Sequence, residues 1–295
     1  MTTVSAPTTT SSAPSRRVGP DWPFYLGLGI LSGVYVVLIV GMLFAQSSFT
    51  SPNHVWSVLK SEEVRAAVYL SLISCSATAI LSVWVAVPFG YLLSRHRFRG
   101  KVLLDALLDI PIVLPPLVIG LGLLILFQTK IGRGIEDGFR IPGTSLHTPG
   151  IPFTFTKAGV VLAQFMVACA FAVRTMRVTF DQINPRQELV ALTLGCTRGQ
   201  AFWSVVLPQA RRGIITAATL AWARSLGEFG PILIFAGATR MRTEVLPTTV
   251  FLELSYGNIE AAAAVSILMI VAAGIVLAIV RIFGLREDSS KGKVI

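Results

Sequence analysis

The chain has 295 residues, of which 53% are hydrophobic and only 14% are charged, and its mean hydropathy is +0.71. A soluble domain carries roughly 25% charged residues, so this composition excludes an ordinary water-soluble protein and indicates that a bilayer is the solvent. The net charge of +10 comes without a basic stripe interleaved with aromatic residues, so it indicates membrane topology rather than nucleic-acid binding.

Residues 1–20 are rich in Thr, Ser and Pro and are predicted to form a disordered cytoplasmic tail. The first apolar run, residues 24–45, is longer than the core of a secretory signal peptide, and no A-x-A cleavage site follows it. We therefore expect a membrane span, although the pair Arg16-Arg17 weakly matches a twin-arginine signal and leaves cleavage open.

Five further apolar runs follow, each long enough for a helix to cross the hydrocarbon, which takes about 20 residues. They lie at residues 66–93, 110–127, 158–180, 213–236 and 261–283. The runs are continuous and lack the alternation of barrel strands, so they predict an all-α integral membrane protein with six transmembrane helices.

Lys and Arg residues are divided unequally between the connections. Those on the side of the N-terminus hold about twice as many as the opposite set, which predicts an N-in/C-in topology. The expected domains are a cytoplasmic tail (1–20), a transmembrane permease domain (21–286) and a short cytoplasmic tail (287–295). We expect no folded regulatory domain after Phe283. The Gly- and Pro-rich connection at residues 129–156 is expected outside, where it could cap a pathway, meet a partner or be plain surface.

The connection between the fourth and fifth runs is predicted to be cytosolic and carries strong local signals. Pro185 suits the first turn of a helix, because its missing N–H would be unpaired there, and Asn184 can cap that turn. Gly195 is typical of the position just past a helix C-terminus. A second amphipathic piece at residues 198–206 is expected to stop at Leu207-Pro208. The pattern predicts either a projection built for a partner or an ordinary loop on the membrane surface.

This frame resembles the cytoplasmic loop signature of binding-protein-dependent ABC transporter permeases. That signature reads Glu-Ala-Ala, three residues, Gly, nine residues, Ile, one residue, Leu-Pro. Here Gly195 is followed by nine residues and then by Val205, Val206, Leu207 and Pro208.

The front of the signature departs from the family. Leu189-Val190-Ala191 stands where the family has Glu-Ala-Ala, so that only Ala191 is retained, and Glu188 lies one position earlier. The departure concerns the role of an acidic residue at the start and leaves the glycine turn unaffected.

Two further segments carry the resemblance and narrow it to molybdate and sulfate permeases. The segment PIVLPPLVIG, from Pro111 to Gly120, is similar to the third-span signature of that group. The segment ARSLGEFG, from Ala223 to Gly230, is similar to its AR-x-GEFG segment.

The resemblance implies that this chain receives force and does not generate it. In the family, the cytosolic projection docks into a groove on a separate ATPase subunit, whose closure rocks the spans between inward- and outward-facing states. The sequence has no G-x-x-x-x-G-K-[ST], so we expect no cofactor on this chain and place ATP and Mg²⁺ on the partner. The coupling residues implied are Glu188, Ala191, Gly195, Val205, Leu207 and Pro208.

Two charged residues, Arg224 and Glu228, fall inside the fifth run. A lone charge at the bilayer centre costs at least about 2.5–3.5 kcal/mol, so such residues usually pair and face a bundle interior. Four apart on a helix, they share one face and form either a structural ion pair or part of a pathway or gate, which the resemblance favours. Pro231, with Gly227 and Gly230 just before it, predicts a kink or break. The pathway or gate candidates are Arg224, Gly227, Glu228, Gly230, Pro115 and Pro116.

The resemblance implies a permease subunit of an ABC importer in the plasma membrane that carries a tetrahedral oxyanion. Molybdate is the first candidate, followed by tungstate and by sulfate or thiosulfate. The partners implied are a second permease chain, two ATPase subunits, an extracytoplasmic binding protein and membrane lipid, with no nucleic acid. We expect a homodimer, although the sequence also admits a heterodimer.

Two other classes remain as alternatives. A transporter driven by an ion gradient would need midplane carboxylates and an internal repeat, and no clear repeat is present. A membrane enzyme would need a cluster of catalytic side chains at membrane depth, whereas His54, His96 and His147 all lie in predicted connections. The three cysteines have no metal-binding spacing, so no metal site and no catalytic residue are predicted.

Overall fold

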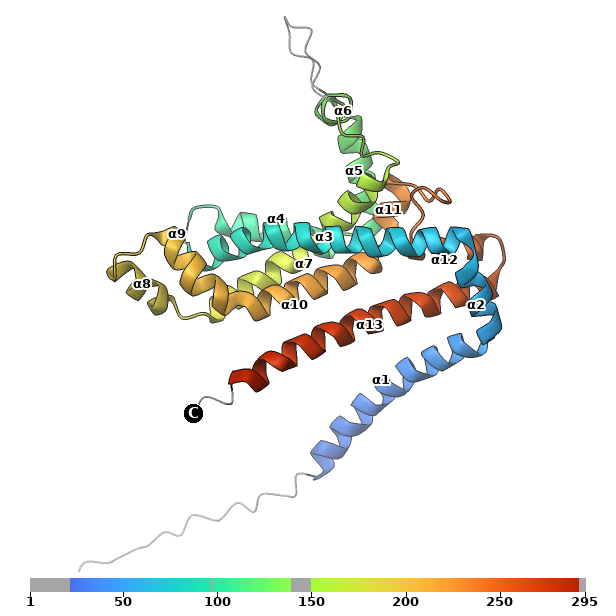
Figure 1. The fold of residues 1–295 in the computed structure, drawn as a ribbon, viewed down its shortest axis with the longest axis horizontal. Helices are drawn as coiled ribbons and strands as arrows, with labels where there is room; N and C mark the ends of the chain where they lie inside the picture. Colours follow the sequence, from blue (N-terminus) through green and yellow to red (C-terminus); the bar gives the residue numbers. More distant parts are fainter. Residues whose placement is uncertain (1–21, 97, 139–149, 292–295) are drawn as a thin grey trace, which may run out of the picture. The chain divides into compact units, whose positions relative to one another are not determined.

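The computed structural model describes residues 22–96, 98–138 and 150–291 (Figure 1). The chain divides into two compact units, Met1–Ser48 and Phe49–Ile295. The regular structure of the described residues is helical, with no strand among them, which confirms the all-α prediction. The predicted tail at residues 1–20 and the middle of the connection at 129–156 lie outside the described residues.

The described part of the first unit is one helix, α1 (Trp22–Ser48). Its large apolar side chains are exposed all round the helix, as is typical of a segment whose solvent is lipid. This helix contains the first predicted run.

The second unit holds the remaining helices in the following order. They are α2 (Pro52–Lys60), α3 (Glu62–Arg95), α4 (Lys101–Val113), α5 (Pro116–Gln128), α6 (Lys130–Asp137), α7 (Lys157–Gln182), α8 (Pro185–Thr193), α9 (Arg198–Ala201), the π-helix η1 (Phe202–Val206), α10 (Leu207–Leu226), α11 (Gly230–Phe235), α12 (Leu246–Ser255) and α13 (Ile259–Lys291).

The core of this unit is formed by α3, α7 and α10, which pack side by side (Figure 1). Small residues allow the helices to approach closely, as is usual where lipid gives helices no hydrophobic reason to associate. At Gly90 of α3, an added Cβ would lie 2.8 Å from the Cβ of Met176 on α7. The α4 helix is tied to α7 by an ion pair of 2.5 Å between Asp105 and Arg177.

Four described helices are long and apolar enough to cross a bilayer, namely α1, α3, α7 and α13. The pair α4 and α5 is a fifth candidate if it counts as one span, but it bends by 112° where Leu114 and Pro115 separate its halves. The third predicted run is therefore not one straight helix, because Pro115 and Pro116 cannot donate backbone hydrogen bonds at the bend.

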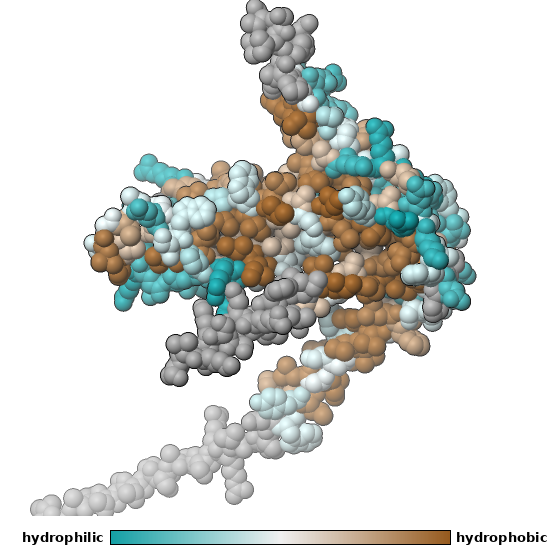
Figure 2. Space-filling view, viewed as in Figure 1, coloured by the Kyte–Doolittle hydropathy of each residue, from teal (hydrophilic) through white to brown (hydrophobic). Residues whose placement is uncertain are grey.

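The fifth predicted run is divided between α10 and α11, with residues 227–229 between them. Pro231 occupies the first turn of α11, so the predicted break before this proline is confirmed. On the face drawn in Figure 2, hydrophobic residues cover the middle of α3, and hydrophilic residues gather around α2 and α12 at one end and α8 and α9 at the other.

Candidate functional site

The first turn of α8 is built as the sequence predicts. The Asn184 side-chain oxygen accepts a hydrogen bond of 3.0 Å from the Arg186 N–H, and Pro185 follows directly as the first helical residue. These contacts satisfy or remove backbone donors that have no partner within the helix. The cap of α8 is therefore formed by residues next to it in the sequence.

The end of α8 is a complete glycine cap. Gly195 has a φ of +91°, and its N–H donates to the Leu192 carbonyl at 3.1 Å. The Cys196 N–H donates to the Ala191 carbonyl at 3.1 Å, which completes the Schellman pattern. The predicted glycine turn is confirmed. The positive φ is the reason that favours glycine here. Packing is not, because nothing lies within 4 Å of a Cβ built at this position.

The second amphipathic piece does not stop at Leu207-Pro208, so that expectation is wrong. A capping box between Thr197 and Gln200 starts α9, and the chain passes through η1 directly into α10. The Leu207 N–H closes the π turn on the Phe202 carbonyl, and Pro208 then lies in the first turn of α10. A proline is tolerated in a first turn, and a π turn adjusts the backbone around it.

Glu188, the displaced acid of the loop signature, ties α8 to the end of α3. Tyr91 Oη donates to Glu188 Oε1 at 2.5 Å, and Arg95 Nε lies 3.5 Å from Glu188 Oε2. Arg95 also donates through Nη2 to the Ile183 carbonyl at 2.8 Å, just before α8 begins. The side chains of Arg95 and Glu188 are only 11% and 13% exposed, so the tether is largely shielded from water.

The opposite side of α8 presents apolar side chains to the outside. Leu189 and Val190 are 58% and 57% exposed and Leu194 is 80% exposed, whereas Ala191 is buried against the protein. The helix is thus fixed on one face and apolar on the other, and exposed large apolar groups that gather on one feature commonly mark an interaction site.

The remaining coupling candidates lie on the continuous helix that follows. Val205 of η1 and Leu207 of α10 are half-buried, and Pro208 is exposed. Val206 between them is fully buried, so it is this position that anchors the segment in the core.

Arg224 and Glu228 form an ion pair at the end of α10. Arg224 Nη2 lies 2.7 Å from Glu228 Oε1, and the Arg224 guanidinium carbon lies 5.6 Å from the centre of the Phe171 ring on α7. The Glu228 side chain is 1% exposed, whereas that of Arg224 is 31% exposed. The pair therefore joins a buried carboxylate to a guanidinium that is partly exposed.

Gln164, in the middle of α7, holds the last turn of α10 and was not predicted. Its Nε2 donates to the Ser225 carbonyl at 3.3 Å, and its Oε1 accepts from Thr78 Oγ1 of α3 at 3.2 Å. An amide within an apolar run was the available signal, because polar groups at membrane depth need partners.

The structure brings the two span motifs together at the α5–α11 contact. A Cβ at Gly120 would lie 2.8 Å from Pro231 Cα, and one at Gly230 would lie 2.9 Å from the Leu117 nitrogen. Pro116 begins α5 beside this contact, and Pro115 precedes it. By contrast, a Cβ at Gly227 would meet only the Arg224 carbonyl at 3.8 Å, so packing does not require glycine there.

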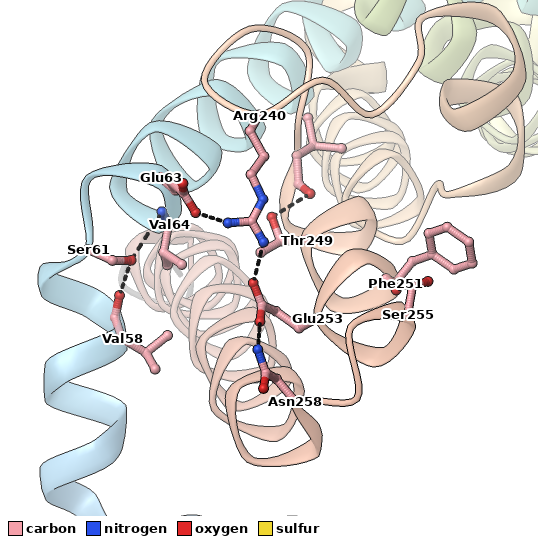
Figure 3. A network of polar contacts seen from close by, with 11 residues as sticks. Val58, Ser61, Glu63, Val64, Arg240, Thr249, Phe251, Glu253, Ser255 and Asn258 are labelled. Atoms are coloured by element: carbon pink, nitrogen blue, oxygen red, sulfur yellow. Dashed lines mark hydrogen bonds and ion pairs between the residues drawn. The ribbon is translucent and has the colours of Figure 1, made fainter.

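A second polar network lies at the other end of α3 (Figure 3). Arg240 pairs with Glu63 of α3 and with Glu253 of α12, and Asn258 Nδ2 donates to Glu253 Oε2 at 3.2 Å. Burial opposes the charge of Arg240, but the carboxylates of Glu63 and Glu253 hold its pKa above the usual value. Burial raises the pKa of nearby Glu244, which is 3% exposed.

Among the described residues, no group of three or more His, Cys, Asp or Glu side chains could hold a metal ion. The described site thus consists of a projecting helix, an ion pair at a helix break, and a tight contact between two helix ends.

Residues 86–287 match the family described as binding-protein-dependent transport system inner membrane component. The chain is 33% identical over 264 residues to the sulfate transport system permease protein CysT of Escherichia coli, covering 89% of this chain and 92% of the relative. It is 33% identical over 257 residues to the molybdenum transport system permease protein ModB of Mycobacterium tuberculosis, covering 87% and 93%.

The fold is similar to a chain in a solved structure of a bacterial alginate ABC transporter in complex with an alginate pentasaccharide-bound periplasmic protein. The TM-score is 0.68 at 17% sequence identity, and the match covers 92% of this chain and 96% of the other. At this identity the likeness concerns the fold alone.

Proposed function

The chain belongs to the binding-protein-dependent inner-membrane transport components, the permease subunits of ABC importers, and from this premise we propose that its cargo is a tetrahedral oxyanion. Molybdate is our first candidate, and sulfate, thiosulfate and tungstate are the alternatives within the same family. The support is that the relatives are named for sulfate and molybdenum and that both span motifs of that group are present.

We propose that α8 is the coupling helix and docks on an ATPase subunit. The observation that carries this role is the pairing of an exposed apolar face, Leu189, Val190 and Leu194, with a shielded tether through Glu188 on the other side. Such a helix can transmit a push, because its outer face binds the partner while its inner face stays fixed to α3. ATP and Mg²⁺ belong to the partner, and this chain binds no cofactor and catalyses no reaction.

The proposed assembly contains two copies of this permease, two ATPase subunits and an extracytoplasmic binding protein. Each copy contributes six spans in an N-in/C-in topology, with α10 and α11 together forming the fifth. The tail at 1–20, the permease domain at 21–286 and the tail at 287–295 remain the proposed division of the chain. The charge bias of the connections supports this orientation.

The proposed pathway passes the broken fifth span. Arg224 and Glu228 mark the break, and the contact of Gly120 with Pro231 beside Pro116 joins two helix ends that can move as a gate. Discontinuous helices at membrane depth are a known way to present polar groups to a passing ion.

The test is uptake of radiolabelled molybdate by cells that express the whole importer and lack their own oxyanion permeases. We expect uptake that requires ATP, that is lost when this chain is omitted, and that unlabelled tungstate or sulfate reduces according to their affinity. A complete, inserted complex that hydrolyses ATP but imports none of these oxyanions would contradict the proposed cargo. Uptake that follows an ion gradient without an ATPase would favour the secondary-transporter alternative.

A further inference from the structure

A small pocket of about 220 Å³ lies near the Arg240 network. It is formed by the first half of α3, the start of α7 and the segment at residues 236–245 that joins α11 to α12. The walls from the two helices are largely apolar and include Leu70, Ile73 and Val161. Glu244 of the joining segment is the one acid among the described lining residues. We call this cavity the Glu244 pocket.

The carboxylate of Glu244 is buried without a partner. Its residue is 3% exposed, and neither carboxylate oxygen accepts a hydrogen bond from a described residue. Burial raises the pKa of this carboxyl. The nearby Thr249 hydroxyl opposes that shift, but its own hydrogen bond goes to the Val245 carbonyl at 3.1 Å. An ionised carboxylate in such surroundings is costly, so Glu244 favours a species that neutralises it.

Arg240 does not supply that neutralisation. Its two Nη atoms bind the carboxylates of Glu63 and Glu253 (Figure 3). Its Nε has no hydrogen-bond partner among the described residues, and the Glu244 oxygens have none either, so the two side chains do not meet. Three carboxylates therefore share one guanidinium, and Glu244 has no cation bound to it.

The other groups of the pocket disfavour a metal ion. Lys157 and Arg242 line it with exposed side chains, neither donates to Glu244, and both would repel an incoming cation. The described residues offer no cluster of three or more metal-ligating side chains, whereas Ca²⁺ takes about six to eight oxygen ligands. A proton needs a single carboxylate oxygen, so it is the species that fits this pocket.

The joining segment is held closed over the pocket by a few contacts. The Leu246 N–H donates to Ser71 Oγ of α3 at 2.8 Å, and the Thr243 N–H donates to the Thr239 carbonyl at 3.0 Å. Met241, which lines the pocket, has a φ of +61°, where a residue with a Cβ is strained. Movement of the segment away from α3 would relieve this strain and would also hydrate an ionised Glu244.

We infer that Glu244 is a proton switch, which holds the segment at residues 236–245 against α3 when a proton is bound and lets it open when the proton leaves. This inference goes beyond the proposed function and does not depend on the cargo. The segment follows α11, which packs against α5, so its opening would also affect the contact of these two helices. The pH on this side of the membrane would therefore bias the proposed gate.

The direction of the pH dependence follows from burial. In the open arrangement Glu244 meets water and ionises above its ordinary pKa of about 4.5, whereas the closed arrangement raises that pKa. The closed arrangement is therefore fully favoured below the ordinary value and loses stability as the pH rises through the raised one. The other titratable or charged side chains around the pocket and its network are Glu63, Tyr69, Lys157, Arg240, Arg242, Glu253 and Tyr256.

The main experiment measures the unfolding temperature of the purified full-length chain between about pH 5 and about pH 8. Glu244→Gln is uncharged and nearly isosteric, so it should match wild type at the acid end. At the alkaline end it should unfold about 2–4 °C above wild type, because it cannot ionise in the pocket. The matched control is Glu260→Gln, which removes an exposed acid of α13 and should follow the wild-type profile.

Three outcomes would overturn the inference. In the first, Glu244→Gln and Glu260→Gln differ from wild type by the same amount at every pH. In the second, Glu244→Gln unfolds below wild type throughout the range, as expected if Glu244 is ionised and paired. In the third, sodium or calcium chloride stabilises wild type at about pH 8 relative to choline chloride but leaves Glu244→Gln unchanged, which would assign the pocket to a metal ion.

A second measurement keeps Glu244 and so covers a Glu244→Gln chain that does not fold. Ser74 lines the pocket and is fully buried, so Ser74→Cys reports its opening in a chain whose native cysteines are replaced by alanine. Its rate of reaction with methyl methanethiosulfonate, divided by the rate at exposed Ser255→Cys, should rise severalfold from about pH 5 to about pH 8. Both thiols stay mostly neutral in this range and gain reactivity in step, so a constant ratio would contradict the switch.

Discussion

A single backbone angle decides how α8 ends. Gly195 adopts a φ of +91°, in the region where residues with a Cβ are strained, while the space around it is empty. Gly199, four residues later in α9, also has empty space around a built Cβ but lacks the positive φ. The two positions therefore separate backbone strain from steric fit.

Gly195→Ala should cost about 1–2 kcal/mol of local stability, because the left-handed conformation is unfavourable for alanine. We expect molybdate uptake per ATP to fall, while membrane insertion and basal ATPase activity are kept. Gly199→Ala in parallel assays should leave this ratio unchanged. A Gly195→Ala importer that couples as well as the Gly199→Ala importer would exclude a role for the glycine turn.

The residues that could be predicted are those whose partners are close in sequence. Asn184, Pro185 and Gly195 act on bonds within α8, so local patterns identified them. Tyr91 lies 97 residues from the Glu188 that it contacts, and Gln164 lies 61 residues from Ser225. Contacts at such separations depend on how helices pack, which no local pattern states.

At the scale of elements, apolar run length predicted where helices lie but not how they bend. The run at 110–127 contains nothing polar at Leu114-Pro115, yet the chain bends there by 112°. At Leu207-Pro208 the prediction was wrong in the opposite direction. The helix was expected to end there, but it continues from η1 into α10. Proline removes a donor, and whether the helix ends or adjusts depends on the surrounding turn.

The α5–α11 contact offers a matched test of packing. A Cβ at Gly120 would lie 2.8 Å from Pro231 Cα, whereas nothing lies within 4 Å of one at Gly122 in the same helix. We expect Gly120→Ala to destabilise the purified permease by about 1–3 kcal/mol and to reduce uptake, because backbone must move apart.

Thermal unfolding of the detergent-purified chain, together with uptake by the importer, measures both effects. Gly122→Ala should lower neither, because nothing lies within 4 Å of a Cβ built there. Should both variants unfold at the temperature of wild type, the close approach of α5 and α11 would not matter for stability.

At the scale of the whole molecule, α3 connects two distant polar networks. Its 34 residues give it a length of about 50 Å, more than the hydrocarbon thickness of about 30 Å. Glu63 at its start binds Arg240, and Arg95 at its end binds Glu188. The networks are thus far enough apart to lie on opposite sides of a membrane.

The proposed orientation places the α8 network in the cytosol and the Arg240 network outside. Ser204→Cys and Ser255→Cys, each an exposed serine in a cysteine-free chain, report on the two sides. We expect a membrane-impermeant maleimide to label Ser255→Cys in intact cells and Ser204→Cys only after permeabilisation. The reverse pattern would invert the topology and remove α8 from reach of a cytosolic ATPase.

The helical path from α9 through η1 to α10 is unbroken, so these three elements form one continuous helix. The helix is not interrupted between Arg198 beside α8 and Leu226 beside the break, although it contains Gly199 and Gly213, so a displacement at one end is passed on to the other. A displacement of the α9 end would therefore also move Arg224, which lies three residues before the start of the break at residues 227–229. The segment next to α8 and the arginine that pairs with Glu228 thus lie on one continuous helix, which ends at the break.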